Sequence, residues 1–99
     1  STWHSLDRDA YCNLKKATIF TRLYVRHSAD QVKSVLMRLF DQHCVLAHHN
    51  IILLFHDDQE THTRQQEMLF EMLKMFRMTA DIQRSKFDAE SPKDAGFEL

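Results

Sequence analysis

Hydrophobic and polar residues alternate along Thr18–His27, which reads TIFTRLYVRH. Because successive side chains of a β-strand point to opposite sides, this alternation predicts a strand with two unlike faces. One face carries Ile19, Thr21, Leu23 and Val25, and the other carries Phe20, Arg22, Tyr24 and Arg26. The first set can cover a hydrophobic core, whereas the second combines aromatic rings with guanidinium groups.

The period changes at Ser28, and the segment Ser28–Phe40 has the spacing of an amphipathic helix. Its apolar stripe is formed by Val32, Val35, Leu36, Leu39 and Phe40. Ser28 is a favourable N-cap, Gln31 follows three residues later as in a capping box, and Asp30 lies in the first turn. We therefore expect a capped helix directly after the first predicted strand.

The second half of the chain predicts three more segments. Asn50–His56 contains the apolar run Ile51–Phe55, which suits a central strand, and the polar stretch Asp57–Thr63 is expected to form a loop. Good helix formers then fill Gln65–Met78, and a short last strand is expected at Arg84–Phe87.

This order of elements favours an α+β fold, a ubiquitin-like β-grasp roll, with an all-α helical bundle as the alternative. Ninety-nine residues form a single domain, 1–99, with a core over about 14–88 and a tail over 89–99. Ser1–Asn13 is either a weak first strand or a chain end. One glycine and one proline disfavour an all-β sandwich, which needs frequent turn residues.

Charge is unevenly distributed, although the net charge is only −1. Ala10–Phe40 holds six basic residues and one acidic residue, whereas Ile51–Leu99 holds six basic and ten acidic residues. A nearly neutral chain with one basic end favours a localised acidic partner over general nucleic-acid binding. The candidate partner-binding residues are Lys15, Lys16, Arg22, Arg26, Lys33 and Arg38. The alternative is that these side chains are simply solvated.

The residues with catalytic or metal-binding chemistry do not form a recognisable motif. Seven histidines and two cysteines lack the paired spacing of a structural zinc site, and Cys44 beside His43 is only a sequence neighbour. We expect no enzyme activity, no metal and no cofactor. Two lone cysteines and the absence of a long apolar run predict a cytoplasmic protein that does not insert into membranes.

Methionines recur through the predicted second helix, at Met68, Met72, Met75 and Met78. Such a stripe usually fills a core, but it also suits self-association or a partner helix. The chain could therefore be a structural association module that uses Met68, Phe70, Met72 and Met75 within the segment 68–78.

Several segments, taken in order, resemble a Ras-association domain. The helix segment HSADQVKSVLMRLF ends at Phe40 and is followed by Asp41–Cys44, by the apolar strand Ile51–His56 and by the helix Glu67–Phe76. RSKF, which ends at Phe87, stands where that family has its last strand. The similarity spans about Thr18 to Phe87 and is nearest to the branch of lamellipodin and the growth-factor-receptor-bound adaptors. The tryptophans of that branch are absent, with Asn50 and Phe76 at those places.

The resemblance implies a non-enzymatic module that binds a GTP-loaded small GTPase of the Ras/Rap family. It implies that Thr18–His27 offers a strand edge to the GTPase, while Arg22, Arg26 and Lys33 meet acidic switch residues. It also implies cytoplasmic signalling, with recruitment to membranes through a lipidated GTPase.

Overall fold

The computed structural model describes residues 8–40 and 43–98. The elements in chain order are α1 (Arg8–Lys16), β1 (Ile19–Val25), the 3-10 turn η2 (Ala29–Val32), α2 (Lys33–Leu39), β2 (Val45–His48), β3 (Ile51–His56), α3 (Gln59–Met75) and β4 (Ala80–Ala89). The α+β class is confirmed, and the all-helical alternative is wrong. Of the segment Ser1–Asn13, residues 1–7 lie outside the described part, and residues 8–13 belong to the helix α1 and not to a strand.

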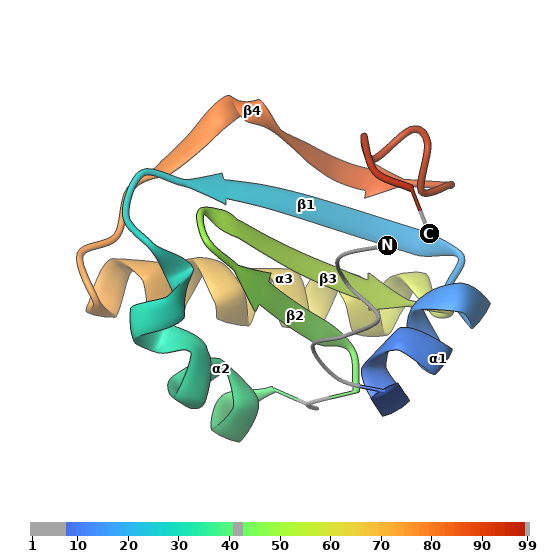
Figure 1. The fold of residues 1–99 in the computed structure, drawn as a ribbon, viewed down its shortest axis with the longest axis horizontal. Coiled ribbons are helices and arrows are strands. Elements are labelled where there is room, and N and C mark those ends of the chain that lie inside the picture. The colour runs from blue at the N-terminus through green and yellow to red at the C-terminus, as the bar shows by residue number, and fades with distance from the viewer. Residues whose placement is uncertain (1–7, 41–42, 99) are drawn as a thin grey trace.

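The four strands form one sheet in the order β2-β3-β1-β4, and every pairing is antiparallel (Figure 1). From β1 onward the elements follow one another as βαββαβ, which is the connectivity of a split βαβ unit. β1 is hydrogen-bonded to β3 on one side and to β4 on the other. The expectation that Thr18–His27 offers a free strand edge is therefore wrong, because both of its edges are occupied.

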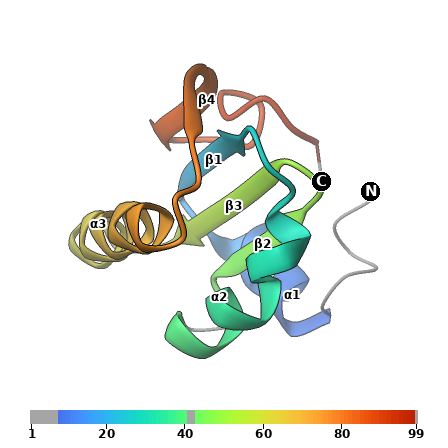
Figure 2. The same cartoon turned by 90° about the vertical axis from the view of Figure 1, so that its left-hand side faces the viewer.

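The alternation predicted for β1 is confirmed, and it divides the core into two clusters. Leu23 and Val25 of β1 pack with Ile52 and Leu54 of β3 beneath α2 and α3. Phe20 points to the opposite face and packs with β3 residues, α1 and the C-terminal segment. Figure 2 shows α3 on one side of the sheet and α1 on the other.

The helix expected at Ser28–Phe40 begins as η2 and continues as α2. Ser28 caps it as predicted, since its Oγ accepts a hydrogen bond of 3.2 Å from the backbone N–H of Asp30. Leu36 and Phe40 are buried against the sheet, as the stripe requires. The side chains of Val32 and Leu39 lie outside the described part.

α3 begins at Gln59, so the expectation of a loop throughout Asp57–Thr63 is wrong. The cause is Asp58, whose carboxylate accepts hydrogen bonds from the backbone N–H and the hydroxyl of Thr61, at 2.9 and 2.6 Å. The helix ends at Met75, and Arg77 follows with a left-handed φ of 54°. No helix in the described part of the chain is long and apolar enough to cross a membrane.

β4 is longer and less regular than the expected Arg84–Phe87. Its register against β1 shifts twice, and Asp88 adopts a left-handed φ of 53° at one irregularity. The segment after β4, expected to be a tail, packs back onto the sheet. Ala95 is fully buried, and the ring of Phe97 lies 5.7 Å from that of Phe20.

Candidate functional site

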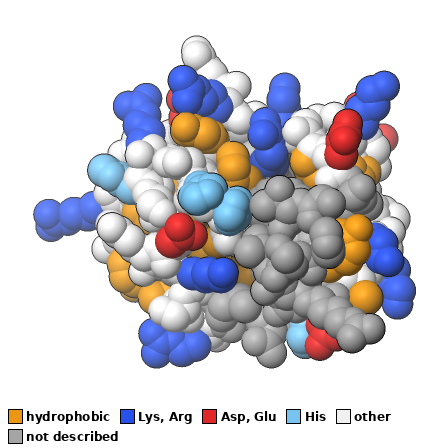
Figure 3. Space-filling view, viewed as in Figure 1, with side chains coloured by type: hydrophobic (Ala, Val, Ile, Leu, Met, Phe, Trp, Pro, Cys, Tyr) orange, Lys and Arg blue, Asp and Glu red, His pale blue; other side chains and the backbone are white. Residues whose placement is uncertain are grey.

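Three cations and one aromatic ring gather where β1 meets β4, on the face of the sheet away from α3. We call Arg22, Tyr24, Arg84 and Lys86 the basic sheet patch. Arg22 and Lys86 are direct partners across the two strands, so their side chains leave the same face. The guanidinium carbon of Arg84 lies 5.0 Å from the centre of the Tyr24 ring. Figure 3 views this face and shows Lys and Arg side chains along its upper edge.

The irregular course of β4 is what brings Arg84 over Tyr24. Ser85 fixes this course, since its Oγ accepts from the Tyr24 N–H at 2.9 Å and donates to the Asp81 carbonyl at 2.7 Å. The Asp81 carboxylate lies 3.6 Å from Arg84 Nε and is 22% exposed, compared with 64% for Arg84. The cation is therefore the more accessible partner of this ion pair.

Arg22 is half-buried beneath the C-terminal segment. Its Nη2 donates to the Arg84 carbonyl at 3.5 Å, and its Nε is buried without a hydrogen-bond partner. The C-terminal segment packs closely over this side chain, since a Cβ added to Gly96 would lie 3.1 Å from the Arg22 guanidinium. A buried donor without a partner costs roughly 1–3 kcal/mol. The buried Nε of Arg22 therefore lowers the free energy of unfolding.

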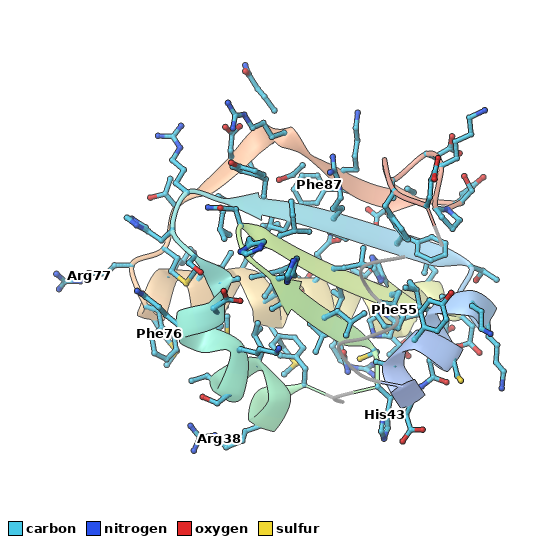
Figure 4. All side chains as sticks on the ribbon, in the orientation of Figure 1. Arg38, His43, Phe55, Phe76, Arg77 and Phe87 are labelled. Carbon is cyan, nitrogen blue, oxygen red and sulfur yellow. The ribbon has the colours of Figure 1, made fainter. Side chains whose placement is uncertain are left out.

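The six predicted binding residues do not form one surface. Lys15 and Lys16 end α1, while Lys33 and Arg38 belong to α2, on the face of the sheet opposite to Arg22. Figure 4 shows Arg38 at the far side of the molecule from β4. Arg26 is exposed just after β1. Sequence reasoning missed Arg84 and Lys86, because they lie in the half of the chain with more acidic residues.

The residues expected to mediate self-association differ in their exposure to solvent. Phe70 is half-buried, 5.8 Å from the Phe87 ring that Figure 4 labels, and Met72 is only 2% exposed. Met68 and Met75 are 43% and 75% exposed. Only the latter two are therefore accessible to a partner.

A buried polar network crosses the opposite face, between β1, α3 and β4. His62 is fully buried, and its Nε2 lies 2.7 Å from Thr21 Oγ1 and 3.6 Å from the Asp88 carboxylate. The Thr21 hydroxyl donates to Gln66 and accepts from the Asp88 N–H at 3.2 Å. With the Thr21 proton committed to Gln66, its oxygen accepts from His62 Nε2–H, which leaves His62 Nδ1 as an acceptor.

The network continues to the surface through His56. His56 Nδ1 lies 2.8 Å from His62 Nδ1 and donates to it, and His56 Nε2 lies 3.0 Å from Gln65 Oε1. The Cys44 thiol donates to the same oxygen at 3.1 Å.

Two groups of this region have shifted pKa values. Burial, followed by the neighbouring His56, lowers the pKa of His62 from 6.5 to about 4, whereas Asp88 acts in the opposite direction. Hydrogen bonds from the side chain and backbone of Thr61 hold the pKa of Asp58 below its usual range. His62 is therefore neutral near pH 7 and serves as a hydrogen-bonding group.

A cleft of about 300 Å³ opens where this network reaches the surface, lined among others by Lys16, Cys44, His56 and Asp57. It lies where the end of α1 meets the end of β3 and the start of α3. Within residues 8–40 and 43–98, no three His, Cys, Asp or Glu side chains are grouped so that they could hold a metal ion. The cleft therefore combines hydrogen-bonding and titratable groups, and the described residues around it do not form a metal centre.

Protein-family models, curated proteins and solved structures were all compared with the chain, and none of them matches it.

Proposed function

We propose that this chain is a non-enzymatic recognition module that binds an acidic protein surface through the basic sheet patch. One observation carries the proposal: the pairing of Arg22 with Lys86, together with the stacking of Arg84 on Tyr24, places three cations on one face. Tyr and Arg are enriched at protein interfaces, where they supply both contact area and hydrogen bonds.

The mode of binding follows from the sheet. Because β3 and β4 occupy both edges of β1, the partner meets side chains and does not add a strand to β1. Cations on one face steer an acidic surface during encounter, and salt screens this attraction over about 10 Å at 0.1 M ionic strength. We expect affinity that falls as salt rises.

The finer proposal concerns the partner and rests on the resemblance to Ras-association domains. We propose a GTP-loaded small GTPase of the Ras/Rap family, whose switch is ordered only with GTP bound. Cytoplasmic location with recruitment through a lipidated GTPase is part of this proposal. The assignment to a β-grasp roll rests on the same resemblance, whereas the antiparallel pairing of β4 with β1 favours a split βαβ unit.

The test is a titration with GTP-loaded and GDP-loaded Ras and Rap proteins. Arg84→Glu reverses a charge in the patch, and Arg38→Glu makes the same charge change on α2, away from it. We expect Arg84→Glu to weaken binding at least about tenfold and Arg38→Glu to leave it nearly unchanged. Equal losses in both variants would rule out the patch, and no binding to any GTP-loaded protein would rule out the partner class.

Arg22→Met separates recognition from folding. Methionine keeps the apolar stem of Arg22 and removes the buried Nε that has no hydrogen-bond partner. We expect the melting temperature to stay level or rise while binding weakens. A variant that unfolds more easily and still binds normally would show that Arg22 serves the fold alone.

A further inference from the structure

α3 carries an exposed stripe on the side turned away from the core. Arg64, Met68, Glu71 and Met75 are spaced i, i+4, i+7 and i+11, so they lie along one line of the helix. Leu69, Met72 and Leu73 face the core instead. The stripe borders a shallow groove of about 400 Å³, lined by Arg64, Glu67, Met68, Glu71, Met72 and Met75.

The charges along this stripe are complementary to those of the same stripe read in reverse. Arg64 lies toward one end and Glu71 toward the other, with Met68 between them. When two such helices pack antiparallel about a two-fold axis between positions 67 and 68, each Arg64 lies opposite Glu71 of the other copy. The two Met68 side chains then meet at the axis. A parallel arrangement would instead place like charges opposite each other.

We propose that the outer face of α3 binds a second copy of this chain, as an antiparallel two-fold dimer. Methionine suits the centre of such a contact, because its flexible side chain fills an irregular surface well. The two Arg64–Glu71 pairs flank the methionines and fix both direction and register. Glu67 lines the same groove one residue from the axis, so its charge partly opposes the contact.

The chemistry of the groove disfavours other occupants. Its lining carries two acidic side chains, Glu67 and Glu71, and one cation, Arg64, so the groove lacks the basic surplus that attracts an anionic membrane surface. An apolar partner helix would leave Arg64 without an acidic partner, whereas Glu71 lies 3.4 Å from Lys74 of its own helix. A second copy supplies an acidic partner for Arg64 in Glu71, whose side chain is 71% exposed.

The dimer has a consequence for recognition that is independent of which acidic partner binds. α3 packs on the face of the sheet that carries Leu23 and Val25, whereas Arg22 and Lys86 belong to the other face, so dimerisation through α3 does not cover the basic sheet patch of either copy. The dimer is therefore bivalent, and it binds a surface with clustered partners more tightly than a monomer does.

A charge-swap experiment tests the dimer without reference to any partner. The molar mass of the intact chain is measured by light scattering over a concentration series, for the wild type, Arg64→Glu, Glu71→Arg and the double variant. We expect each single change to weaken dimerisation about tenfold or more and the double variant to restore it. Lys93→Glu, an exposed charge reversal outside α3, should have no effect.

Mixing the two single variants gives the sharpest outcome. A chain with glutamate at both positions complements a chain with arginine at both, so the mixture should form heterodimers although each variant alone is monomeric. Residues 64 and 71 of one helix are two turns apart and do not contact each other. Rescue in the mixture therefore reports a contact between residue 64 of one chain and residue 71 of the other. A wild-type chain that is monomeric at millimolar concentration, or a swap without rescue, would overturn the proposal.

Discussion

His62 makes the stability of this fold depend on pH. It is fully buried between β1, α3 and β4, and its neutral ring donates to Thr21 and accepts from His56. Protonation would place a cation in this site and remove the acceptor at Nδ1. The carboxylate of Asp88, 3.6 Å from Nε2, offsets only part of this cost.

The magnitude follows from the two pKa values. The pKa of His62 falls from 6.5 in the unfolded chain to about 4 in the fold. The unfolded chain therefore binds more protons between these values, and the free energy of unfolding falls as the pH drops from 6.5 to 4. At about 1.4 kcal/mol for each tenfold change in proton affinity, the loss is roughly 3 kcal/mol. Asp58 adds a loss only below about pH 3.8, because its own pKa is lowered.

Urea unfolding at a series of pH values from 7 to 4 measures this effect. Wild type should lose roughly 3 kcal/mol across that range, and His62→Gln should lose much less, although it starts from a lower stability at pH 7. His27→Gln removes an exposed histidine and should keep the wild-type dependence. If His62→Gln and wild type show the same slope, or if the His62 ring titrates near pH 6.5 by NMR, the reasoning is wrong.

Two further predictions concern stability. Thr21→Val removes the hydroxyl that accepts from His62 and from the Asp88 N–H. The free energy of unfolding, measured with urea, should fall by about 1–3 kcal/mol. An unchanged value would show that the network does not stabilise the fold. Leu54→Ala leaves a cavity at a fully buried site beneath the helices and should lower the free energy of unfolding by about 2–5 kcal/mol. Ile82→Ala changes a side chain that is 59% exposed and should alter this free energy by less than about 0.5 kcal/mol. Calorimetry of both variants checks the contrast.

The parts of the fold that were predictable from sequence are those in which local pattern and burial agree. The alternation in β1 follows from one buried and one partly exposed face. Ser28 caps the following helix through a bond that spans only two residues. The apolar run of β3 reflects burial of Ile52–Phe55 on both faces of the sheet.

Other elements depend on contacts that the chain pattern does not display. β2 has only four residues, and its hairpin to β3 turns at His49, which adopts a left-handed φ of 53°. A glycine is the usual sequence signal for such a turn, and none is present here. The start of α3 is polar and reads as a loop, yet Asp58 caps it and His62 is buried within its first two turns.

The candidate sites were the least predictable part. Counting charges along the chain placed the basic surface within Ala10–Phe40, but α2 carries Lys33 and Arg38 to the face opposite Arg22. The residues that join Arg22 come from β4, more than sixty positions later. The one signal in the sequence was the pair Arg84 and Lys86, both on a segment already expected to be a strand.

Backbone NMR of the labelled chain, titrated with a GTP-loaded Ras or Rap protein, tests the central claim most directly. We expect the amide signals of β1 and β4 around Arg22, Arg84 and Lys86 to shift or broaden, and those of α2 around Arg38 to stay in place. Shifts centred on α2, or on the cleft beside His56, would contradict recognition through the basic sheet patch.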